Sequence, residues 1–332
     1  MKNKTLILII SLFALNHTVN ADVSKICKDA LKTIPEDSIT YKGQDGWLFT
    51  GAELRHLSVG KFWGKDAGRA SRCNRPDRAD PLPAIIDFNS QLKKLGIKLI
   101  MLPVPPKATI YPEGITKNLQ AEQSSKRLKE FYKSLSSKNV DVLDLSETFI
   151  ELKNKKKYLY CRQDSHWSGY GCEIAAEQIT LKIKAMPWYK KIEKLEYSAT
   201  KREIQIKGDL WKSLKDKSRP KEKLALRFIK GKTVSPSSPV LLMGDSHTLI
   251  FHAGDDMLAK NAGLIDQLAF DLKMPVNLLA VRGSGATTVR INLYRKAKKK
   301  NWLKNIKVII WCFTARDFTE ARSGWRKIPV KE

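Results

Sequence analysis

The sequence predicts an α/β fold with a mostly parallel sheet and helices on both faces. Apolar runs such as IKLIMLPV from Ile97 and VLLMG from Val240 are typical of buried interior strands. Segments with apolar residues at helical spacing, such as 83–95, alternate with these runs. A mature chain of roughly 310 residues is also long enough to bury one sizeable core. Together these observations predict a three-layer domain.

The expected elements follow one another with one interruption. A short helix is expected over 28–40, and YKGQDGWLF at 41–49 predicts a turn between two short strands. The other expected elements are helices at 83–95, 121–137 and 168–186, a lysine-rich helix near 290–300, and strands at 97–106, 140–145, 240–244, 274–283 and 306–313. The interval 188–239 is charged and predicts a small β-rich insertion within a single domain over 22–332.

The first 21 residues have the features of a secretory signal peptide. Lys2 and Lys4 precede an apolar run from Leu6 to Leu15, and a small-residue exit follows at Ala21. The apolar run is much shorter than the roughly 20 residues that a membrane span needs. No later segment is apolar enough to cross a bilayer. We therefore expect a cleaved, periplasmic protein that does not span the membrane.

The chain is strongly basic, with a formal net charge of +27 and lysine runs at 155–157 and 298–300. Such an excess attracts polyanions. Nucleic acid is not an expected partner, because the protein is exported and contains no recognisable nucleic-acid module. An acidic polysaccharide or an anionic membrane surface fits the compartment better. The alternative, that the lysines only solvate exposed helix faces, has equal weight.

Five cysteines in an oxidising compartment permit disulfides but leave at least one thiol free. Cys312 lies in an apolar run, where a lone cysteine behaves as a small hydrophobe. The expected pairs are therefore Cys27 with Cys73 and Cys161 with Cys172, although the sequence alone does not fix the connectivity. The absence of a Cys-x-x-Cys pair argues against thiol redox chemistry and thiolate zinc.

A Gly-Asp-Ser turn follows the apolar run at 240–243 and places Ser246 at the expected carboxyl end of a strand. A serine nucleophile needs a base and an orienting acid. In DSHWS, Asp164 and His166 are two residues apart, which lets the carboxylate meet the imidazole, and Ser168 can cap the next helix.

Two other interpretations compete with this one. The Asp-x-His pair is an ordinary cap with a surface histidine, or it binds a metal together with His247 or His252. No spacing typical of metal ligands supports the second interpretation. We therefore expect neither a metal nor a cofactor.

Seven motifs in order resemble the SGNH-like domain of the AlgX/AlgJ-like alginate O-acetyltransferases. These motifs, which extend from about Tyr41 to Arg322, are GWLF at 46–49, PVPPK with YPE at 103–113, DSHWS at 164–168, GDL at 208–210, GDS at 244–246, RGSG at 282–285 and VIIWCFTARDF at 308–318. The resemblance implies an SGNH-hydrolase-like fold with circularly permuted motif order. It implies Ser246 as nucleophile, His166 as base and Asp164 as the partner of the base.

The same resemblance implies the reaction but does not fix the sugar. It implies acetyl transfer to an exported polysaccharide, with the acetyl group supplied by a membrane-bound O-acyltransferase partner. The residue after the serine is His247, where an aromatic is expected, and WCFTARD replaces a Trp-Glu-hydrophobic pattern, so the sugar is not fixed. The chain ends near Glu332, so we expect no carbohydrate-binding module after the catalytic domain.

Several residues are candidates for an oxyanion or substrate site. Gly283, Ser284 and Gly285 can supply a backbone N–H, whereas Arg282 suits a uronic carboxylate; a plain strand-to-helix turn explains this loop equally well. The other candidates are His247, Trp167 beside the base, and Lys107, which either borders the cleft or is a surface lysine. Two alternatives to the transferase remain: an acetylesterase with the same triad, and a non-catalytic polysaccharide-binding scaffold.

Overall fold

A parallel four-stranded sheet forms the centre of the molecule. The computed structural model describes residues 22–153, 157–214, 218–283 and 286–331, so the expected signal peptide and the candidates Ser284 and Gly285 lie outside the described residues. The strand order is β3-β8-β6-β7, and every neighbouring pair is parallel. The strands of this sheet are β3 (Lys98–Val104), β6 (Val240–Gly244), β7 (Asn277–Ala280) and β8 (Val308–Thr314).

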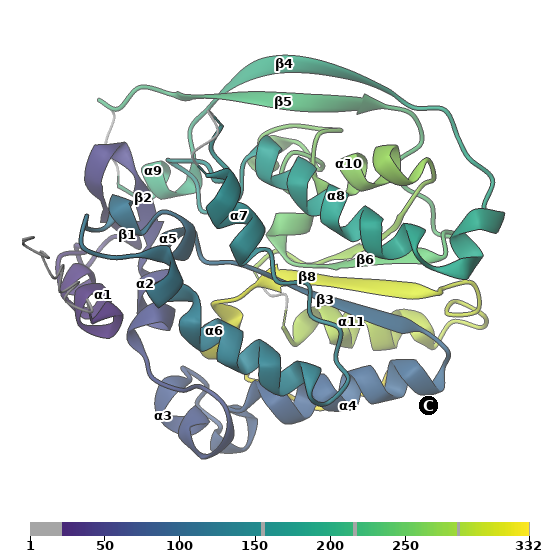
Figure 1. Ribbon diagram of the computed structural model, residues 1–332, viewed down its shortest axis with the longest axis horizontal. Helices are drawn as coiled ribbons and strands as arrows, with labels where there is room; N and C mark the ends of the chain where they lie inside the picture. Colours follow the sequence, from purple (N-terminus) through teal and green to yellow (C-terminus); the bar gives the residue numbers. More distant parts are fainter. Residues whose placement is uncertain (1–21, 154–156, 215–217, 284–285, 332) are drawn as a thin grey trace, which may run out of the picture.

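Helices cover both faces of the sheet, which confirms the predicted α/β fold (Figure 1). The helices are α1 (Val23–Lys32), α2 (Gly51–Ser58), α3 (Ala67–Ala70), α4 (Pro81–Lys94), α5 (Lys107–Ile110), α6 (Ala121–Ser136), α7 (Ser146–Leu152), α8 (Gly169–Lys184), α9 (Asp209–Ser213), α10 (Leu264–Leu272), α11 (Thr288–Ala297) and α12 (Asp317–Glu320). In Figure 1, α8 and α10 lie above the sheet, and α4, α6 and α11 lie below it.

The side chains of each strand alternate between two apolar cores. In β8, Ile310 and Cys312 pack into the core beneath α8 and α10, while Ile309 and Trp311 pack against α4 and α11. All four of these side chains are fully buried. A strand that is buried on both faces must be apolar at every position, which explains the continuous apolar runs in the sequence. Cys312 is a small hydrophobe of this core, as predicted.

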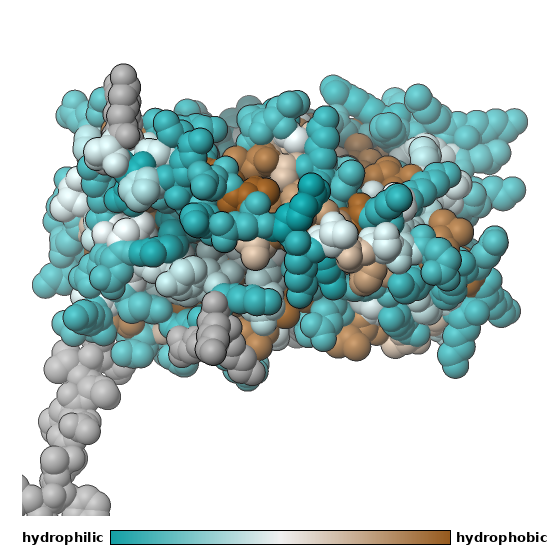
Figure 2. Space-filling model, turned by 90° about the horizontal axis from the view of Figure 1, so that it is seen from above, coloured by the Kyte–Doolittle hydropathy of each residue, from teal (hydrophilic) through white to brown (hydrophobic). Residues whose placement is uncertain are grey.

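Two smaller antiparallel pairs flank the main sheet. The pair β1 (Thr40–Lys42) and β2 (Leu48–Thr50) forms the turn that the aromatic segment predicts. The pair β4 (Ser198–Ile206) and β5 (Glu222–Lys230) is an antiparallel hairpin within the 188–239 interval. Most of β4 is exposed. Figure 2 views the molecule from above and shows many hydrophilic side chains with groups of apolar side chains between them. The division into one domain with an insertion stays a prediction.

Two expected elements differ from the structure. The first helix begins at Val23 and not at Lys28, because the side chain of Asp22 accepts the N–H groups of Ser24 and Lys25 and so caps an earlier start. The expected strand at 140–145 is reduced to one parallel bridge between Val142 and Met101. Among the described residues, no helix is both long and apolar enough to cross a bilayer.

The expected disulfides are not formed, because all five cysteines are free thiols. Cys27 is buried in α1, whereas the Sγ of the half-exposed Cys73 bonds within its own loop, to the carbonyl and N–H of Arg75. The Cys161 Sγ donates to the Trp167 carbonyl at 3.5 Å. Burial raises the pKa of Cys161 and Cys172 well above the ordinary value, so both remain protonated. The predicted pairs Cys27 with Cys73 and Cys161 with Cys172 are therefore wrong in this structure.

Candidate active site

Ser246 lies immediately beyond the carboxyl end of β6, where parallel sheets gather their ligands. It begins a 3₁₀ turn, Ser246–Thr248. The buried carboxylate of Asp245 fixes this turn by accepting the His247 N–H at 2.8 Å and the Thr314 N–H at 2.8 Å. Since Thr314 ends β8, the neighbouring strand holds the serine in place. The turn is therefore anchored by the two central strands of the sheet.

Asp164 and His166 come from a loop that leads into α8. An antiparallel bridge between Tyr160 and Trp167 closes this loop. The Ser168 Oγ then accepts the Gly171 N–H at 3.2 Å and caps α8, as the sequence predicts. Both ends of the loop are thus tied to rigid structure, which limits the motion of the side chains between them.

The three side chains that the sequence singles out meet in one hydrogen-bonded chain. The Nδ1 of His166 lies 2.6 Å from the Asp164 Oδ1, and its Nε2 lies 2.7 Å from the Ser246 Oγ. Asp164 and His166 are buried, whereas Ser246 is half-exposed. The chain of contacts has the order acid, imidazole and alcohol that activates a serine.

Electrostatics favour a charged acid next to a basic imidazole. Burial raises the pKa of Asp164, but the His166 charge and the hydrogen bonds to the carboxylate outweigh burial and hold that pKa well below its usual range. Burial lowers the pKa of His166, but the charge and hydrogen bond of Asp164 outweigh it and raise the pKa above its ordinary value. His166 is therefore a stronger base than an isolated histidine.

Asp209 supports the Asp164 loop and was not identified as a site residue from the sequence. Its N–H donates to the Asp164 Oδ2 at 2.9 Å, and its Oδ1 accepts the Ser165 N–H at 2.7 Å. Gly208 permits this contact, since a Cβ there would lie 2.0 Å from the Gln163 carbonyl oxygen. The GDL motif at 208–210 was the sequence signal for this support.

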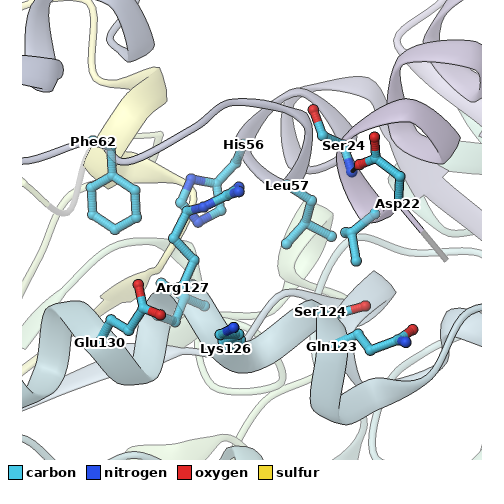
Figure 3. Close-up of a pocket in the computed structure, with 12 residues that line it drawn as sticks. Asp22, Ser24, His56, Leu57, Phe62, Gln123, Ser124, Lys126, Arg127 and Glu130 are labelled. Carbon is cyan, nitrogen blue, oxygen red and sulfur yellow. Dashed lines mark hydrogen bonds between the residues drawn. The ribbon is translucent and has the colours of Figure 1, made fainter. Parts of the chain in front are cut away.

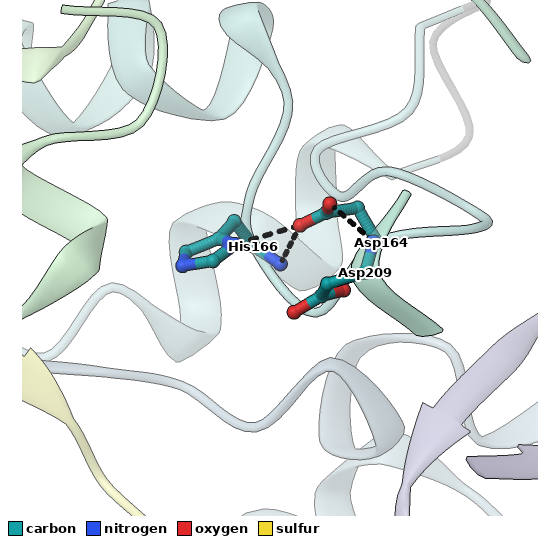
Figure 4. A group of neighbouring side chains, drawn as sticks. All are labelled: Asp164, His166 and Asp209. Atoms are coloured by element: carbon teal, nitrogen blue, oxygen red, sulfur yellow. Dashed lines mark hydrogen bonds and ion pairs between the residues drawn. The ribbon is translucent and has the colours of Figure 1, made fainter. Parts of the chain in front are cut away.

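Asp164, His166 and Asp209 are also close enough to be tested as metal ligands (Figure 4). The Asp164 oxygens already accept N–H groups of His166 and Asp209, and the Asp209 oxygens accept the Ser165 N–H and Oγ–H. Each carboxylate accepts three such hydrogen bonds and is therefore arranged for hydrogen bonding. The donor set therefore fits an oriented imidazole better than a metal ligand cluster.

Lys107 neither borders the cleft nor lies on the surface, because its side chain is only 1% exposed. Its Nζ donates to the carbonyls of Asp164 at 2.7 Å and Cys161 at 3.0 Å. The buried carboxylate of Glu53 accepts the Ala108 N–H at 2.8 Å and places a negative charge in the same region. Lys107 thus holds the Asp164 loop from beneath.

The other substrate-binding candidates lie at different depths. Trp167 is fully buried and its ring packs edge-on against His247, so it lies beneath the site and has no exposed surface for substrate. His247 is also buried, with its Nδ1 3.1 Å from the Asp245 Oδ1. Arg282 is exposed and pairs with Asp256 at 2.6 Å, and Gly283 is exposed beside it.

A separate cavity of about 450 Å³ lies between α1, α2 and α6 and contains His56 (Figure 3). The Nδ1 of His56 lies 3.0 Å from the Thr319 Oγ1, and no carboxylate orients its ring among the described residues. Burial, followed by the charges of Arg127 and Arg316, lowers the pKa of His56 to about 3. This histidine is a neutral structural residue and not the base of a second site.

The pKa of His56 predicts a pH-dependent stability. The pKa is about 3 in the folded protein and about 6.5 in the unfolded chain, so the unfolded chain binds more protons below pH 6.5. The contribution of the neutral His56 to the free energy of unfolding is fully present above pH 6.5. It is lost as the pH falls, by about 3 kcal/mol between pH 7 and pH 4. Urea unfolding at several pH values should show a flatter pH dependence for His56→Gln. Equal slopes in both proteins would contradict this assignment.

The comparison with family models decides the family. Residues 40–315 match the model ALGX, described as the SGNH hydrolase-like domain of acetyltransferase AlgX. The chain belongs to this family. The resemblance inferred from the motifs is therefore confirmed, together with the SGNH-hydrolase-like fold that it implied.

Several curated proteins that are similar to this chain are named probable alginate O-acetylase AlgJ. The protein of Pseudomonas syringae pv. tomato is 27% identical over 137 residues, which is 41% of this chain and 31% of the relative. The protein of Pseudomonas aeruginosa is 25% identical over 142 residues, which is 43% of this chain and 32% of the relative. The match thus spans about a third of the length of these relatives.

Two solved structures share the fold of the ALGX-family domain. The O-acetyltransferase domain of Pseudomonas putida AlgJ has a TM-score of 0.63 at 21% identity, covering 85% of this chain and 92% of that one. Pseudomonas aeruginosa AlgX has a TM-score of 0.63 at 17% identity, covering 86% of this chain and 65% of that one. At these identities the similarity shows the fold alone.

Proposed function

We propose that this protein is a periplasmic O-acetyltransferase that moves acetyl groups onto an exported polysaccharide through Ser246. The observation that carries the proposal is the unbroken contact from Asp164 through His166 to the Ser246 Oγ. Membership of an acetyltransferase family supports the reaction class. The names of the curated relatives support an exopolysaccharide as the acceptor.

In the first half of the reaction, His166 acts as the general base. Its Nε2 takes the proton of the Ser246 hydroxyl while the Oγ attacks the carbonyl carbon of an acetyl ester. The tetrahedral intermediate collapses, the bond to the donor oxygen breaks, and the proton on Nε2 passes to that leaving oxygen. The product is an acetyl-serine. Asp164 holds the ring with its Nδ1–H toward the carboxylate and stabilises the imidazolium.

In the second half, a sugar hydroxyl replaces the donor. The Nε2 of His166 takes the hydroxyl proton, the sugar oxygen attacks the acetyl-serine, and the proton returns to the Ser246 Oγ as the acyl bond breaks. The proton count is thereby restored. Water in place of the sugar would release acetate and make the same site an esterase.

The negative oxygen of each tetrahedral intermediate needs a hydrogen-bond donor. The N–H of Ser246 opens the 3₁₀ turn, so it has no partner within that turn. We assign this N–H as one donor. Gly283 is the candidate for a second donor among the described residues, since it is exposed and follows β7 in the sheet.

The proposed acetyl donor originates in the cytoplasm and reaches this enzyme through a partner. We expect a membrane-bound O-acyltransferase in that role.

The raised pKa of His166 predicts an acidic limb in the pH–rate profile. The base must be neutral to accept the serine proton, so turnover rises as the pH increases through the pKa of His166. Because Asp164 raises that pKa, the midpoint should lie above about 6.5. The pH dependence of acetyl-ester hydrolysis measures it. A midpoint that stays the same in Asp164→Asn would contradict the role assigned to Asp164.

The test of the proposed function is detection of the covalent intermediate and its product. Protein incubated with a chromogenic acetyl ester and quenched in acid should carry one acetyl group on the peptide containing Ser246, by mass spectrometry. Addition of a uronic-acid oligosaccharide should yield acetylated sugar. Acetate released equally with and without sugar would favour the esterase. Absence of both acetyl-serine and turnover would favour the non-catalytic scaffold.

A further inference from the structure

A pocket of about 690 Å³ lies at the end of the central sheet that is opposite the triad. It is lined by residues 95–97, which precede β3, by residues of the 297–307 segment, which connects α11 to β8, and by Lys331. Because the strands are parallel, all of them begin at this end, whereas Ser246 follows the carboxyl end of β6. In Figure 1 this end lies at the right, where C marks the end of the chain. The pocket is therefore separate from the proposed catalytic site.

Lysines dominate the wall of this pocket. Six of them line it, and all six are exposed: Lys298, Lys299, Lys300, Lys304, Lys307 and Lys331. Among the described residues of the lining, none is acidic and none is an arginine. Asp141, which lines an adjoining pocket, already pairs with Lys98 at 3.2 Å and with Lys182 at 2.7 Å. Across the part of the chain that the structure describes, no carboxylate pairs with the last five of the six lysines. Their positive charge is therefore left uncompensated by the fold.

Apolar side chains lie among these lysines. Leu95 is 41% exposed, and Trp302 and Leu303 are half-buried at the edge of the core that α4 and α11 cover. The Trp302 N–H donates to the Lys299 carbonyl at 3.1 Å, which holds this segment in a turn. Leu95, Trp302 and Leu303 together with the six lysines are called the basic face from here on.

The combination of lysines with exposed apolar groups matches the surface of a membrane that contains anionic phospholipids. Polybasic segments are attracted to such surfaces, and indole rings and long lysine stems favour the boundary between water and lipid. Lysine ammonium groups are compact point charges that bind phosphate, whereas the planar guanidinium of arginine holds a carboxylate through two hydrogen bonds. Since the described lining has lysines and no arginine, it favours lipid phosphate over the carboxylates of a polyuronate.

We propose that the basic face docks the protein on an anionic phospholipid surface. The ammonium groups contact lipid phosphates, and Leu95 and Trp302 meet the headgroup layer. The seven residues of β8 then place the triad end of the sheet about 23 Å farther from the membrane. A membrane-bound acetyl donor has to reach Ser246 across this distance. The inference goes beyond the proposed function and does not depend on it.

Sedimentation with lipid vesicles tests the docking. Wild-type protein should bind vesicles made of an equimolar mixture of phosphatidylcholine and phosphatidylglycerol. It should bind vesicles of phosphatidylcholine alone at least about 10-fold more weakly. The neutral vesicles also report any binding through the apolar run at 6–15. Binding to the anionic vesicles should weaken as the salt concentration rises, because salt screens exposed charges.

Removal of three charges from the basic face should abolish most of this binding. The variant Lys299→Gln/Lys300→Gln/Lys304→Gln should bind the anionic vesicles about 100-fold more weakly than wild type, since each lysine near such a surface contributes about fivefold. Leu95→Ser keeps every charge and should weaken binding by about threefold, because less apolar surface leaves water. Thermal unfolding should show that each variant is folded.

The matched control is Lys42→Gln/Lys117→Gln/Lys201→Gln, which removes the same charge from three exposed lysines outside the basic face. It should bind the anionic vesicles like wild type. The docking proposal is refuted if wild type binds neutral and anionic vesicles equally, if the basic-face variant binds like wild type, or if the control variant loses as much affinity as the basic-face variant.

Two further measurements separate this proposal from others. Acetyl-ester turnover should be the same in the basic-face variant and in wild type, so a failure of the docking and a failure of the proposed function are distinguishable. Soluble polyuronate that binds wild type but not the basic-face variant, while neither protein binds vesicles, would assign the basic face to the polysaccharide and overturn the proposal.

Discussion

Ser246→Ala is expected to reduce acetyl-ester turnover by at least about 1,000-fold, because among the described residues no other hydroxyl contacts the Nε2 of His166. The Ser246 Oγ is the group that the Nε2 of His166 contacts at 2.7 Å. The remaining hydrogen-bond donors can still lower the barrier slightly for direct attack by water. Initial rates with a chromogenic acetyl ester, at saturating ester concentration, measure the change in kcat.

Asp164→Asn tests the charge of the acid without changing the size of its side chain. The asparagine has the same size, but it lacks the charge that stabilises the imidazolium and fixes the Nδ1–H, so kcat should fall by about 10³–10⁴-fold. Thermal unfolding should confirm that each variant is folded. Asp29→Asn is a suitable control, because it makes the same exchange at an exposed carboxylate that pairs with Lys32 in α1. Near-normal turnover in Ser246→Ala would exclude the triad as the catalytic machinery.

The sequence predicts the two halves of this site but not their meeting. Asp164 and His166 are two residues apart, so their contact follows from local geometry. Ser246 is 80 residues away from His166, and its place at a strand end follows from the apolar run before it. What brings them together is the strand order β3-β8-β6-β7, which depends on long-range packing. The family resemblance supplied that step.

Lys107, which sequence reasoning misplaced, and Asp209, which it missed, both act through the backbone. Lys107 bonds to two main-chain carbonyls, and Asp209 bonds to a main-chain N–H. Such contacts leave no pattern of complementary side chains in the sequence. A lysine is also expected to be exposed, because burying its charge is costly without partners. The motifs PVPPK and GDL contained these two residues, but their contacts required the folded loop.

The disulfides were mispredicted for a related reason. A chain that is expected to be exported and has several cysteines permits pairing, but the buried thiols instead serve as small apolar side chains of the core. Cys27, Cys161 and Cys172 are each completely buried. Their spacing in the sequence carries no information about which core position each one fills. The compartment allows a disulfide, while packing decides whether one forms.

Lys107→Met is expected to lower the free energy of unfolding by about 3 kcal/mol or more. The methionine fills a similar volume but leaves the carbonyls of Asp164 and Cys161 without their donor. It also removes the charge that opposes the buried Glu53 carboxylate, whose pKa burial already raises. Turnover should fall as well, because the loop that orients His166 loses its support from beneath. Urea unfolding and ester hydrolysis measure the two effects.

A double-mutant cycle with Glu53→Gln tests whether the two buried charges act together. If Lys107 stabilises the loop partly by compensating Glu53, the variant Lys107→Met/Glu53→Gln should lose less stability than the two single variants combined. The losses of stability and turnover that remain in this double variant, relative to Glu53→Gln, report the hydrogen bonds from Lys107 to the loop. Strict additivity would mean that the Glu53 charge is irrelevant to Lys107. Wild-type stability and turnover in Lys107→Met would show that the Asp164 loop is held by Asp209 and its capped ends without the buried ammonium.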